Sequence, residues 1–162
     1  MPAAHDVAKP ARKFHFISGL PRSGSTLLAA ILNQNPRFRA GMTSPLADIM
    51  GVVVAEMSGK NDFSFDVSDD QRVAMLRGLV ENFHAGHADA GVVFDTSRLW
   101  CSRMQLLSTL FPDAKVIACV RPLPWVLDSM ERLVRRQPTG VSKVFRFDTN
   151  TTVYSRVEAL TD

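Results

Sequence analysis

Residues 14–28 read FHFISGLPRSGSTLL, and the predicted fold rests on this segment. The alternating run from Phe14 to Ile17 predicts a short strand that ends at a glycine turn. After the turn, residues 26–32 are rich in apolar helix formers. A strand, a glycine loop and a helix in this order aim backbone N–H groups and a helix N-terminus at a phosphate.

The loop has the glycine spacing of a phosphate-binding P-loop, with one change. Gly19 and Gly24 are followed by Ser25 and Thr26, whereas a nucleotide hydrolase has lysine where this chain has Ser25. The cation is instead Arg22, and a guanidinium favours bidentate contact with a tetrahedral oxyanion. The groups available to a phosphate are the backbone amides, Arg22 and the hydroxyls of Ser23, Ser25 and Thr26. The alternative is a glycine turn that only joins a core strand to a core helix.

The composition is that of one globular domain. The chain has 162 residues, of which 46% are hydrophobic and 22% are charged, so it is long enough to bury a core. We expect a disordered lead-in over residues 1–12 and one domain over residues 13–162. The net charge of +3 and the isoelectric point near 9.2 suit an anionic ligand, but they are too weak to indicate nucleic acid.

Cysteines and histidines give no metal or disulfide signal. Cys101 and Cys119 are far apart in apolar surroundings. His84 and His87 lie near the end of a predicted helix with no third ligand, so we expect solvated histidines rather than a metal site.

Residues 1–13 lack the apolar segment of a secretory signal, and no run has the length of a transmembrane helix. We therefore expect a cytoplasmic protein.

Hydrophobic patterns predict helices that alternate with apolar strands. Ser44 is the expected N-cap of the second helix, and Ser68 with Gln71 has the spacing of a capping box. Apolar strands separated by helices imply an α/β fold of three layers, in which a parallel sheet binds its ligand at the carboxyl edge. The expected strands are 14–18, 38–42, 91–95 and 115–121, and the expected helices are 25–35, 46–57, 68–86, 103–110, 124–136 and 153–160, with residues 144–147 unassigned.

A second informative run covers residues 115–129, which read KVIACVRPLPWVLDS. Arg121 falls at the end of a predicted buried strand, which places it at the ligand edge of the sheet. Ser129 follows eight residues later, inside the next helix. An arginine at a strand end and a hydroxyl from the next helix can hold one phosphate from two sides. The alternative for Arg121 is an exposed salt bridge of the kind that many surface arginines form.

The segment PRSGST at residues 21–26 resembles the 5′-phosphosulfate loop of sulfotransferases that use 3′-phosphoadenosine 5′-phosphosulfate (PAPS), most closely in the bacterial and tyrosylprotein branch. Arg121 and Ser129 match the family's 3′-phosphate motif, an arginine at a strand end and a serine eight residues on. The resemblance implies a sulfotransferase-like P-loop fold and transfer of a sulfuryl group to a hydroxyl acceptor, with 3′,5′-adenosine diphosphate as product. It implies no metal, and it leaves tyrosyl, glycan and small-molecule hydroxyls open as acceptors.

The resemblance also implies the contacts of individual residues with the donor. Those for the 5′-phosphosulfate are Arg22, Ser23, Gly24, Ser25 and Thr26, and those for the 3′-phosphate are Arg121 and Ser129. Two phosphate-binding segments far apart in the sequence thus match a ligand with a phosphosulfate at one end and a 3′-phosphate at the other.

The chain departs from the family in the second motif and after the first helix. Residues 122–124 are Pro-Leu-Pro where Asp-Pro-Arg is usual, which alters the loop but keeps the phosphate pair. The family's glutamate falls on residues 41–44, which hold no carboxylate, and the nearest replacement is Asp48. Asp48 is our first hypothesis for the base that takes the acceptor proton. The alternative is a solvated aspartate that stabilises the dipole of its helix.

A further departure concerns the leaving group. The family places a lysine just after the strand predicted at 91–95, and Asp95 occupies its approximate position. Arg98 is the residue that can supply the missing positive charge. Asp95 is thus a second candidate base, with two alternatives: it orients Arg98, or it is a cap or turn residue of the segment that follows.

Length leaves other functions open. Sulfotransferases of this type continue well beyond the serine of the second motif, whereas this sequence ends at Asp162. A truncated chain would leave an apolar face uncovered, which would favour self-association into a homo-oligomer. The alternative functions are a non-catalytic nucleotide-binding or assembly protein and a P-loop kinase or hydrolase. A kinase would need a lysine at position 25 and a magnesium carboxylate at a strand end, for which Asp95 is the candidate.

Overall fold

A computed structural model describes residues 12–59, 62–87 and 89–136. The described chain divides into two compact units: the first comprises residues 12–19 and 25–119, and the second comprises residues 20–24 and 120–136. The helix predicted at 153–160, the unassigned residues 144–147 and residues 1–11 of the expected lead-in lie outside the described residues.

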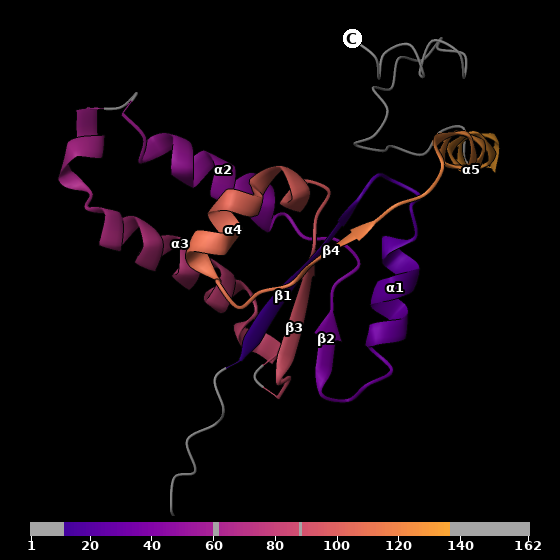
Figure 1. The fold of residues 1–162 in the computed structure, drawn as a ribbon, viewed down its shortest axis with the longest axis horizontal. Coiled ribbons are helices and arrows are strands. Elements are labelled where there is room, and N and C mark those ends of the chain that lie inside the picture. The colour runs from indigo at the N-terminus through magenta and orange to yellow at the C-terminus, as the bar shows by residue number, and fades with distance from the viewer. Residues whose placement is uncertain (1–11, 60–61, 88, 137–162) are drawn as a thin grey trace, which may run out of the picture. The chain divides into compact units, whose positions relative to one another are not determined.

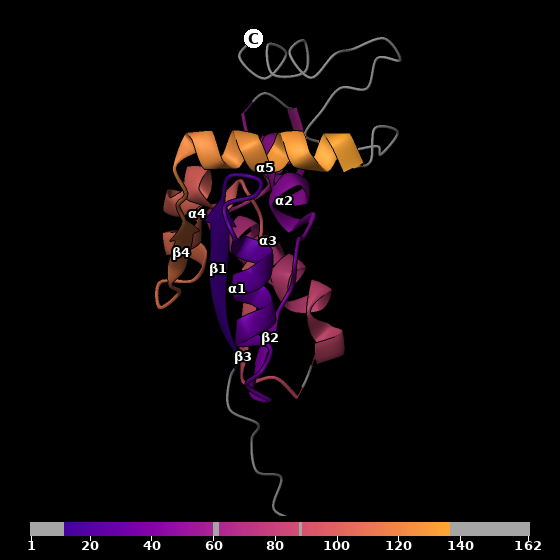
Figure 2. The same ribbon diagram turned by 90° about the vertical axis from the view of Figure 1, so that its right-hand side faces the viewer.

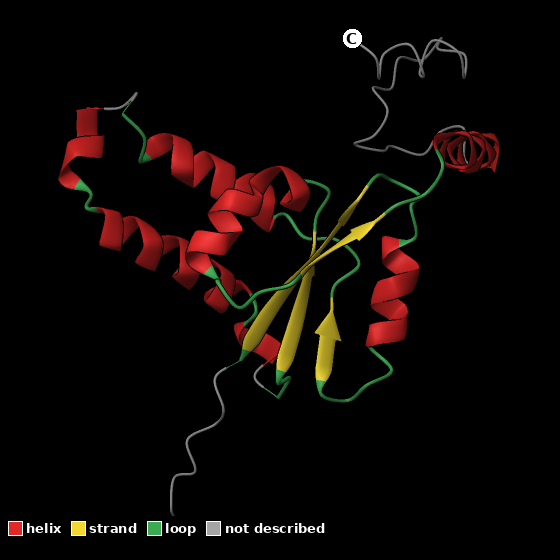
Figure 3. Ribbon diagram, in the orientation of Figure 1, coloured by secondary structure: helices red, strands yellow, loops and turns green. Residues whose placement is uncertain are grey.

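The first unit is built on a sheet of four parallel strands in the order β2-β3-β1-β4 (Figures 1 and 3). The arrows in Figure 3 all point the same way. Consecutive parallel strands need a crossover connection, and in this chain the helices provide it. The strands are β1 (Lys13–Gly19), β2 (Phe38–Ala40), β3 (Val92–Thr96) and β4 (Val116–Cys119).

Helices cover both faces of the sheet, so the predicted α/β class with three layers is confirmed. Figure 1 shows α1 on one side of the sheet and α2, α3 and α4 on the other. Among the described helices, none is both long enough and apolar enough to span a membrane. The helices of this unit are α1 (Ser25–Leu32), α2 (Leu46–Glu56), α3 (Asp69–Phe83) and α4 (Met104–Leu110), with short 3-10 turns at Asp62–Asp66, Ala85–His87 and Trp100–Arg103.

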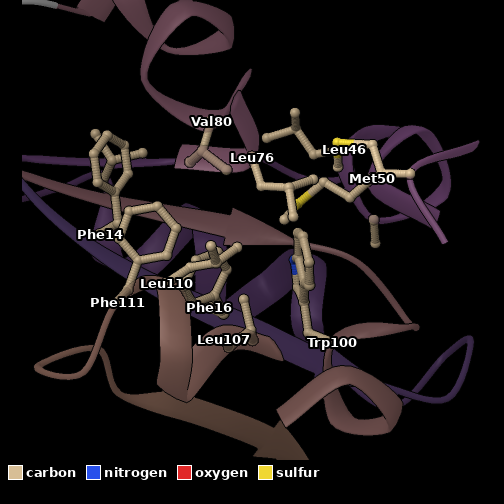
Figure 4. Close-up of a cluster of buried hydrophobic side chains, with 13 residues drawn as sticks. Phe14, Phe16, Leu46, Met50, Leu76, Val80, Trp100, Leu107, Leu110 and Phe111 are labelled. Carbon is tan, nitrogen blue, oxygen red and sulfur yellow. The ribbon is translucent and has the colours of Figure 1, made fainter. Parts of the chain in front are cut away.

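The core lies mainly on the side of α2, α3 and α4 (Figure 4). Phe16 of β1 is fully buried there, with its ring 4.9 Å from the ring of Trp100 and 5.7 Å from that of Phe111. Because successive strand residues face opposite sides, Ile17 enters a smaller cluster on the α1 side, with Ala29. The alternation in β1 therefore anchors both layers of helices to one strand.

The first helix ends earlier than the sequence predicts. We expected it to extend to Asn35, but α1 stops at Leu32. The side chain of Asn33 explains the difference, because its amide nitrogen donates to the Ala40 carbonyl at 2.8 Å and its oxygen accepts from the Ala40 N–H at 2.8 Å. This reciprocal pairing ties Asn33 to β2, and the N–H groups of Gln34 and Asn35 bond to the carbonyls of Ile31 and Leu32 in a turn tighter than an α-helix.

Two other local predictions need correction. The N-cap of α2 is Pro45 rather than Ser44, although the Ser44 hydroxyl accepts from the N–H of Leu46 at 3.1 Å. The strand predicted at 115–121 is shorter, and β4 is half-exposed rather than buried because it is the last strand in the described sheet. Val120, just beyond β4, is 88% exposed.

The predicted capping box of α3 is confirmed. Ser68 accepts from the Gln71 N–H at 3.2 Å, and the Gln71 side chain accepts from the Ser68 N–H at 2.9 Å.

We predict that Ser68→Ala lowers the free energy of unfolding by about 1 kcal/mol, because the first turn of α3 loses its cap. Urea denaturation measures the loss, with Ser108→Ala on the exposed face of α4 as the control; equal stability of both variants would contradict the prediction.

Candidate functional site

The two segments of the second unit leave the sheet from neighbouring strands. In the pairing of β1 with β4, Gly19 and Cys119 are register partners. Residues 20–24 follow Gly19 directly, and residues 120–136 follow Cys119. Parallel pairing therefore starts both segments at the same edge, and side-chain contacts then join them.

The second segment is dominated by α5 (Leu123–Arg136), which Figure 2 shows side-on as one continuous helix. It begins one residue before the predicted start at Pro124. The Pro122 carbonyl accepts from the N–H groups of Trp125 and Val126, at 3.0 and 3.2 Å. Proline suits the first turn of a helix, where its missing N–H has no intrahelical partner to lose.

The loop 20–24 has an unusual backbone. Arg22 has φ 65°, in the left-handed region that non-glycine residues rarely occupy, and Gly24 has φ 107°, which favours glycine. The Ser23 N–H donates to the Leu20 carbonyl at 3.1 Å and closes a turn around Arg22. Such strain in a loop is typical of functional sites, where it fixes the direction of a side chain.

Three of the predicted ligand residues contact one another in this unit. The Nε of Arg22 donates to the Ser129 hydroxyl at 2.9 Å, and the Nη1 of Arg121 donates to the Arg22 carbonyl at 3.0 Å. The loop and the second motif are therefore directly hydrogen-bonded, although Arg22 and Ser129 lie 107 residues apart in the sequence. Arg121 bonds to a backbone carbonyl rather than to a carboxylate, so the alternative of a surface salt bridge has no support among the described residues.

The Ser23 hydroxyl fits a ligand that supplies acceptor atoms. Its oxygen is buried and makes no hydrogen bond with the described residues. A buried hydroxyl without a partner costs free energy, and such groups in proteins are normally satisfied by protein, water or ligand. The Ser23 hydroxyl can donate a hydrogen bond to a phosphosulfate oxygen. The loop residues therefore fit the anionic sulfuryl donor expected from the sequence.

Positive charge is concentrated in the same unit. Residues 20–24 and 120–136 carry five arginines and two carboxylates, a net charge of +3 that equals the formal net charge of the whole chain. Both carboxylates pair one helical turn away, Asp128 with Arg132 and Glu131 with Arg135. The arginines of this unit without a carboxylate partner among the described residues are Arg22, Arg121 and Arg136. This charge favours an anionic ligand.

The other predicted site residues belong to the first unit. Ser25 and Thr26 are the first residues of α1, and Thr26 is exposed. Asp48 is exposed in the first turn of α2 and makes no hydrogen bond or ion pair with the described residues. Arg98 is exposed in the turn after β3, where its carbonyl accepts from the Ser18 hydroxyl at 2.9 Å.

Asp95 lies in the core, where both of its carboxylate oxygens are engaged. It is 1% exposed, accepts from the Trp100 indole N–H at 2.8 Å, and lies 3.0 Å from Nε2 of His84. The prediction that His84 is solvated is therefore wrong: it is 6% exposed, because the buried carboxylate gives its ring a polar partner in the core. An engaged Asp95 is poorly placed to bind magnesium, which disfavours the kinase alternative.

One feature near the end of a strand was not predicted from the sequence. Thr96 ends β3 with its hydroxyl buried and without a partner among the described residues. Its face is that of Phe94, the α1 side of the sheet, because strand residues two apart share a face. An alternating apolar pattern does not show whether the hydroxyl of a buried strand threonine has a hydrogen-bond partner, so there was no sequence signal for Thr96.

Cys119, which ends β4, is not a strong nucleophile at neutral pH. Burial raises the pKa of its thiol, so the protonated form predominates at pH 7. His87, by contrast, has its pKa lowered by desolvation and then by the nearby charge of Arg39, so its ring is neutral at pH 7. Neither residue contributes charge to a ligand site.

The fold and the loop after β1 can be compared with those of known protein families. The fold is a parallel α/β sheet, and one of its strand ends leads into a glycine-containing loop that bears an arginine and a buried hydroxyl without a partner. A family model described as the sulfotransferase family matches residues 15–162. The chain therefore belongs to the sulfotransferase family, as the resemblance of its two motifs predicted, and sulfuryl transfer is the chemistry of that family.

The buried network yields a prediction that separates structure from chemistry. Asp95→Ala leaves the donors of Trp100 and His84 buried without an acceptor, so we expect the free energy of unfolding to fall by about 3 kcal/mol. Asp113→Ala, in the exposed turn after α4, is the control and should change stability by less than about 0.5 kcal/mol. Wild-type stability of Asp95→Ala in urea, together with lost sulfuryl transfer, would instead assign Asp95 to the chemistry.

Proposed function

We propose that this protein is a PAPS-dependent sulfotransferase that forms a sulfate ester on a hydroxyl acceptor. The observation that carries the proposal is the direct bonding of Arg22, Arg121 and Ser129, which unites the two phosphate-binding motifs of the sequence in one positively charged unit. The family supports sulfuryl transfer, and the identity of the donor is inferred from these residues.

The loop residues would hold the 5′-phosphosulfate. The Ser23 hydroxyl has no partner among the described residues and donates to an acceptor oxygen in this proposal. The Arg22 guanidinium uses Nε for Ser129, which leaves its remaining N–H groups for ligand oxygens. Gly24 keeps the backbone open where the chain turns toward α1, and Ser25 and Thr26 add the first amides and hydroxyls of that helix.

Arg121 and Ser129 would hold the 3′-phosphate. A hydroxyl accepts and donates at the same time, so Ser129 can accept from Arg22 while its proton goes to a phosphate oxygen. Arg121 similarly spends one N–H on the Arg22 carbonyl and keeps the others. The contacts within the protein therefore orient these two groups without exhausting them, which is the pre-organisation that anion binding needs.

Asp48 is the base that we propose for the acceptor hydroxyl. It is an exposed carboxylate without a partner among the described residues, whereas both oxygens of Asp95 are engaged. PAPS, when bound, supplies the sulfuryl group to the acceptor oxygen. Asp48 accepts the proton that the acceptor loses, and Arg98 stabilises negative charge on the departing phosphate oxygen. Asp95 then acts as a structural residue beneath the turn that bears Arg98.

A transfer assay tests the proposal. Labelled PAPS is incubated with the protein and a panel of tyrosyl, glycan and small-molecule hydroxyl acceptors. We expect a labelled sulfate ester whose formation falls at least about 100-fold in Arg22→Ala, because the loop loses its cation. Arg135→Ala, an exposed arginine paired with Glu131, is the matched control and should retain activity within about twofold. Binding of 3′,5′-adenosine diphosphate without transfer to any acceptor would favour the non-catalytic alternative.

The 3′-phosphate assignment is tested by calorimetry. We expect Arg121→Ala to weaken binding of 3′,5′-adenosine diphosphate by about 10- to 100-fold, because a charge-assisted contact is lost. Binding of AMP, which lacks the 3′-phosphate, should be nearly unchanged. Arg121→Lys keeps the charge but not the planar donor set, so it should give an intermediate affinity. Equal losses for the two nucleotides in Arg121→Ala would reject the assignment.

A further inference from the structure

Trp125 is an exposed aromatic residue beside the second motif. It lies in the first turn of α5 and is 64% exposed, whereas Trp100, the other tryptophan of the chain, is fully buried. Tryptophan is highly buried on average because its large apolar surface is costly to leave in water. The exposure of Trp125 therefore calls for a role other than filling a core.

The ring of Trp125 contacts the arginine expected to bind the 3′-phosphate. The guanidinium carbon of Arg121 lies 5.9 Å from the ring centroid, within the range of a cation–π interaction. The same guanidinium donates to the Arg22 carbonyl at 3.0 Å. Two independent contacts, one aromatic and one polar, therefore restrict a side chain that is otherwise long and flexible.

The helical spacing joins this contact to Ser129. Trp125 and Ser129 are four residues apart in α5, so they lie on the same face one turn apart. The adjacent row of the helix, Val126 and Met130, is buried, at 2% and 8% exposure. The more exposed row therefore presents the ring that contacts Arg121 and the hydroxyl that contacts Arg22.

We propose that Trp125 is a positioning residue of the 3′-phosphate site, where its ring holds the Arg121 guanidinium in place. The inference rests on the proposed function, because the site itself is the one assigned there to Arg121 and Ser129. In this proposal the ring acts on the ligand only by holding Arg121. Removal of the ring therefore affects recognition of the 3′-phosphate and not of the rest of the nucleotide. Selectivity for a 3′-phosphorylated nucleotide therefore depends on an aromatic side chain outside the phosphate-binding residues.

Calorimetry on the full chain tests this role. We expect Trp125→Ala to weaken binding of 3′,5′-adenosine diphosphate by about fivefold and to leave AMP binding unchanged. Trp125→Phe keeps an aromatic face and should restore most of the loss. Leu127→Ala, also on α5 and 38% exposed, is the matched control and should bind both nucleotides like the wild type. In Arg121→Ala, the further change Trp125→Ala should have no effect, because the ring then has no guanidinium to hold.

A second measurement needs no ligand. Acrylamide quenching of fluorescence reports mainly on Trp125, because Trp100 is fully buried. Arg121→Ala should make Trp125 more accessible to the quencher, whereas Arg135→Ala should not. Unchanged quenching in Arg121→Ala would overturn the ring–guanidinium contact.

The two measurements separate the failure of this inference from that of the proposed function. If the wild type binds 3′,5′-adenosine diphosphate and Trp125→Ala binds it equally well, only the role of Trp125 is overturned. If Trp125→Ala weakens AMP as much as the 3′-phosphorylated nucleotide, the ring contacts the shared nucleotide and does not act through Arg121. Absence of binding to the wild type, with quenching as expected, would overturn the proposed nucleotide site and the positioning role while leaving the contact in place.

Discussion

The candidate site depends on the parallel pairing of β1 with β4. The register partners Gly19 and Cys119 end these strands together, so two segments distant in the sequence start from neighbouring points. Residues 20–24 have no regular secondary structure, and their conformation is set by the turn from Leu20 to Ser23 and by bonds to residues on or before α5. A shift in the register of β4 would separate Arg121 from the Arg22 carbonyl, because the side-chain contact tolerates little displacement.

The sequence could predict the features that follow from local patterns. Alternating apolar residues gave the strands, and the spacing of Ser68 and Gln71 gave the capping box of α3. Side-chain bonds between distant elements could not be predicted, because they have no periodic signature. Asn33 shortened α1 by bonding to β2, and His84 reached the buried Asp95 from the end of α3. In both cases a polar side chain satisfied a distant group and overrode the local pattern.

In the candidate site, too, the residues could be predicted from the sequence but their conformations could not. Residue type and spacing selected Arg22, Arg121 and Ser129, which the structure brings into contact. The backbone of Arg22 was not predictable, since φ 65° is expected of glycine or asparagine rather than arginine. The position of Asp95 on the buried face of β3 was also missed, because the expected strand was placed one residue too early and left this carboxylate at its end. A carboxylate in a run of apolar strand residues is better explained by a buried donor than by solvent.

The contacts also change the electrostatic picture of the loop. The sequence suggested two separate phosphate-binding segments, one replacing the missing P-loop lysine with Arg22 and one centred on Arg121. In the structure the Arg22 side chain bonds to Ser129 and its carbonyl bonds to Arg121, so one residue links both segments. Arg22 has a left-handed backbone, and its guanidinium points toward α5. The lysine of a P-loop would instead extend from the start of the helix after the loop. Because the loop and α5 share these bonds, a change in the conformation of Arg22 would also disturb the side chains of Ser129 and Arg121.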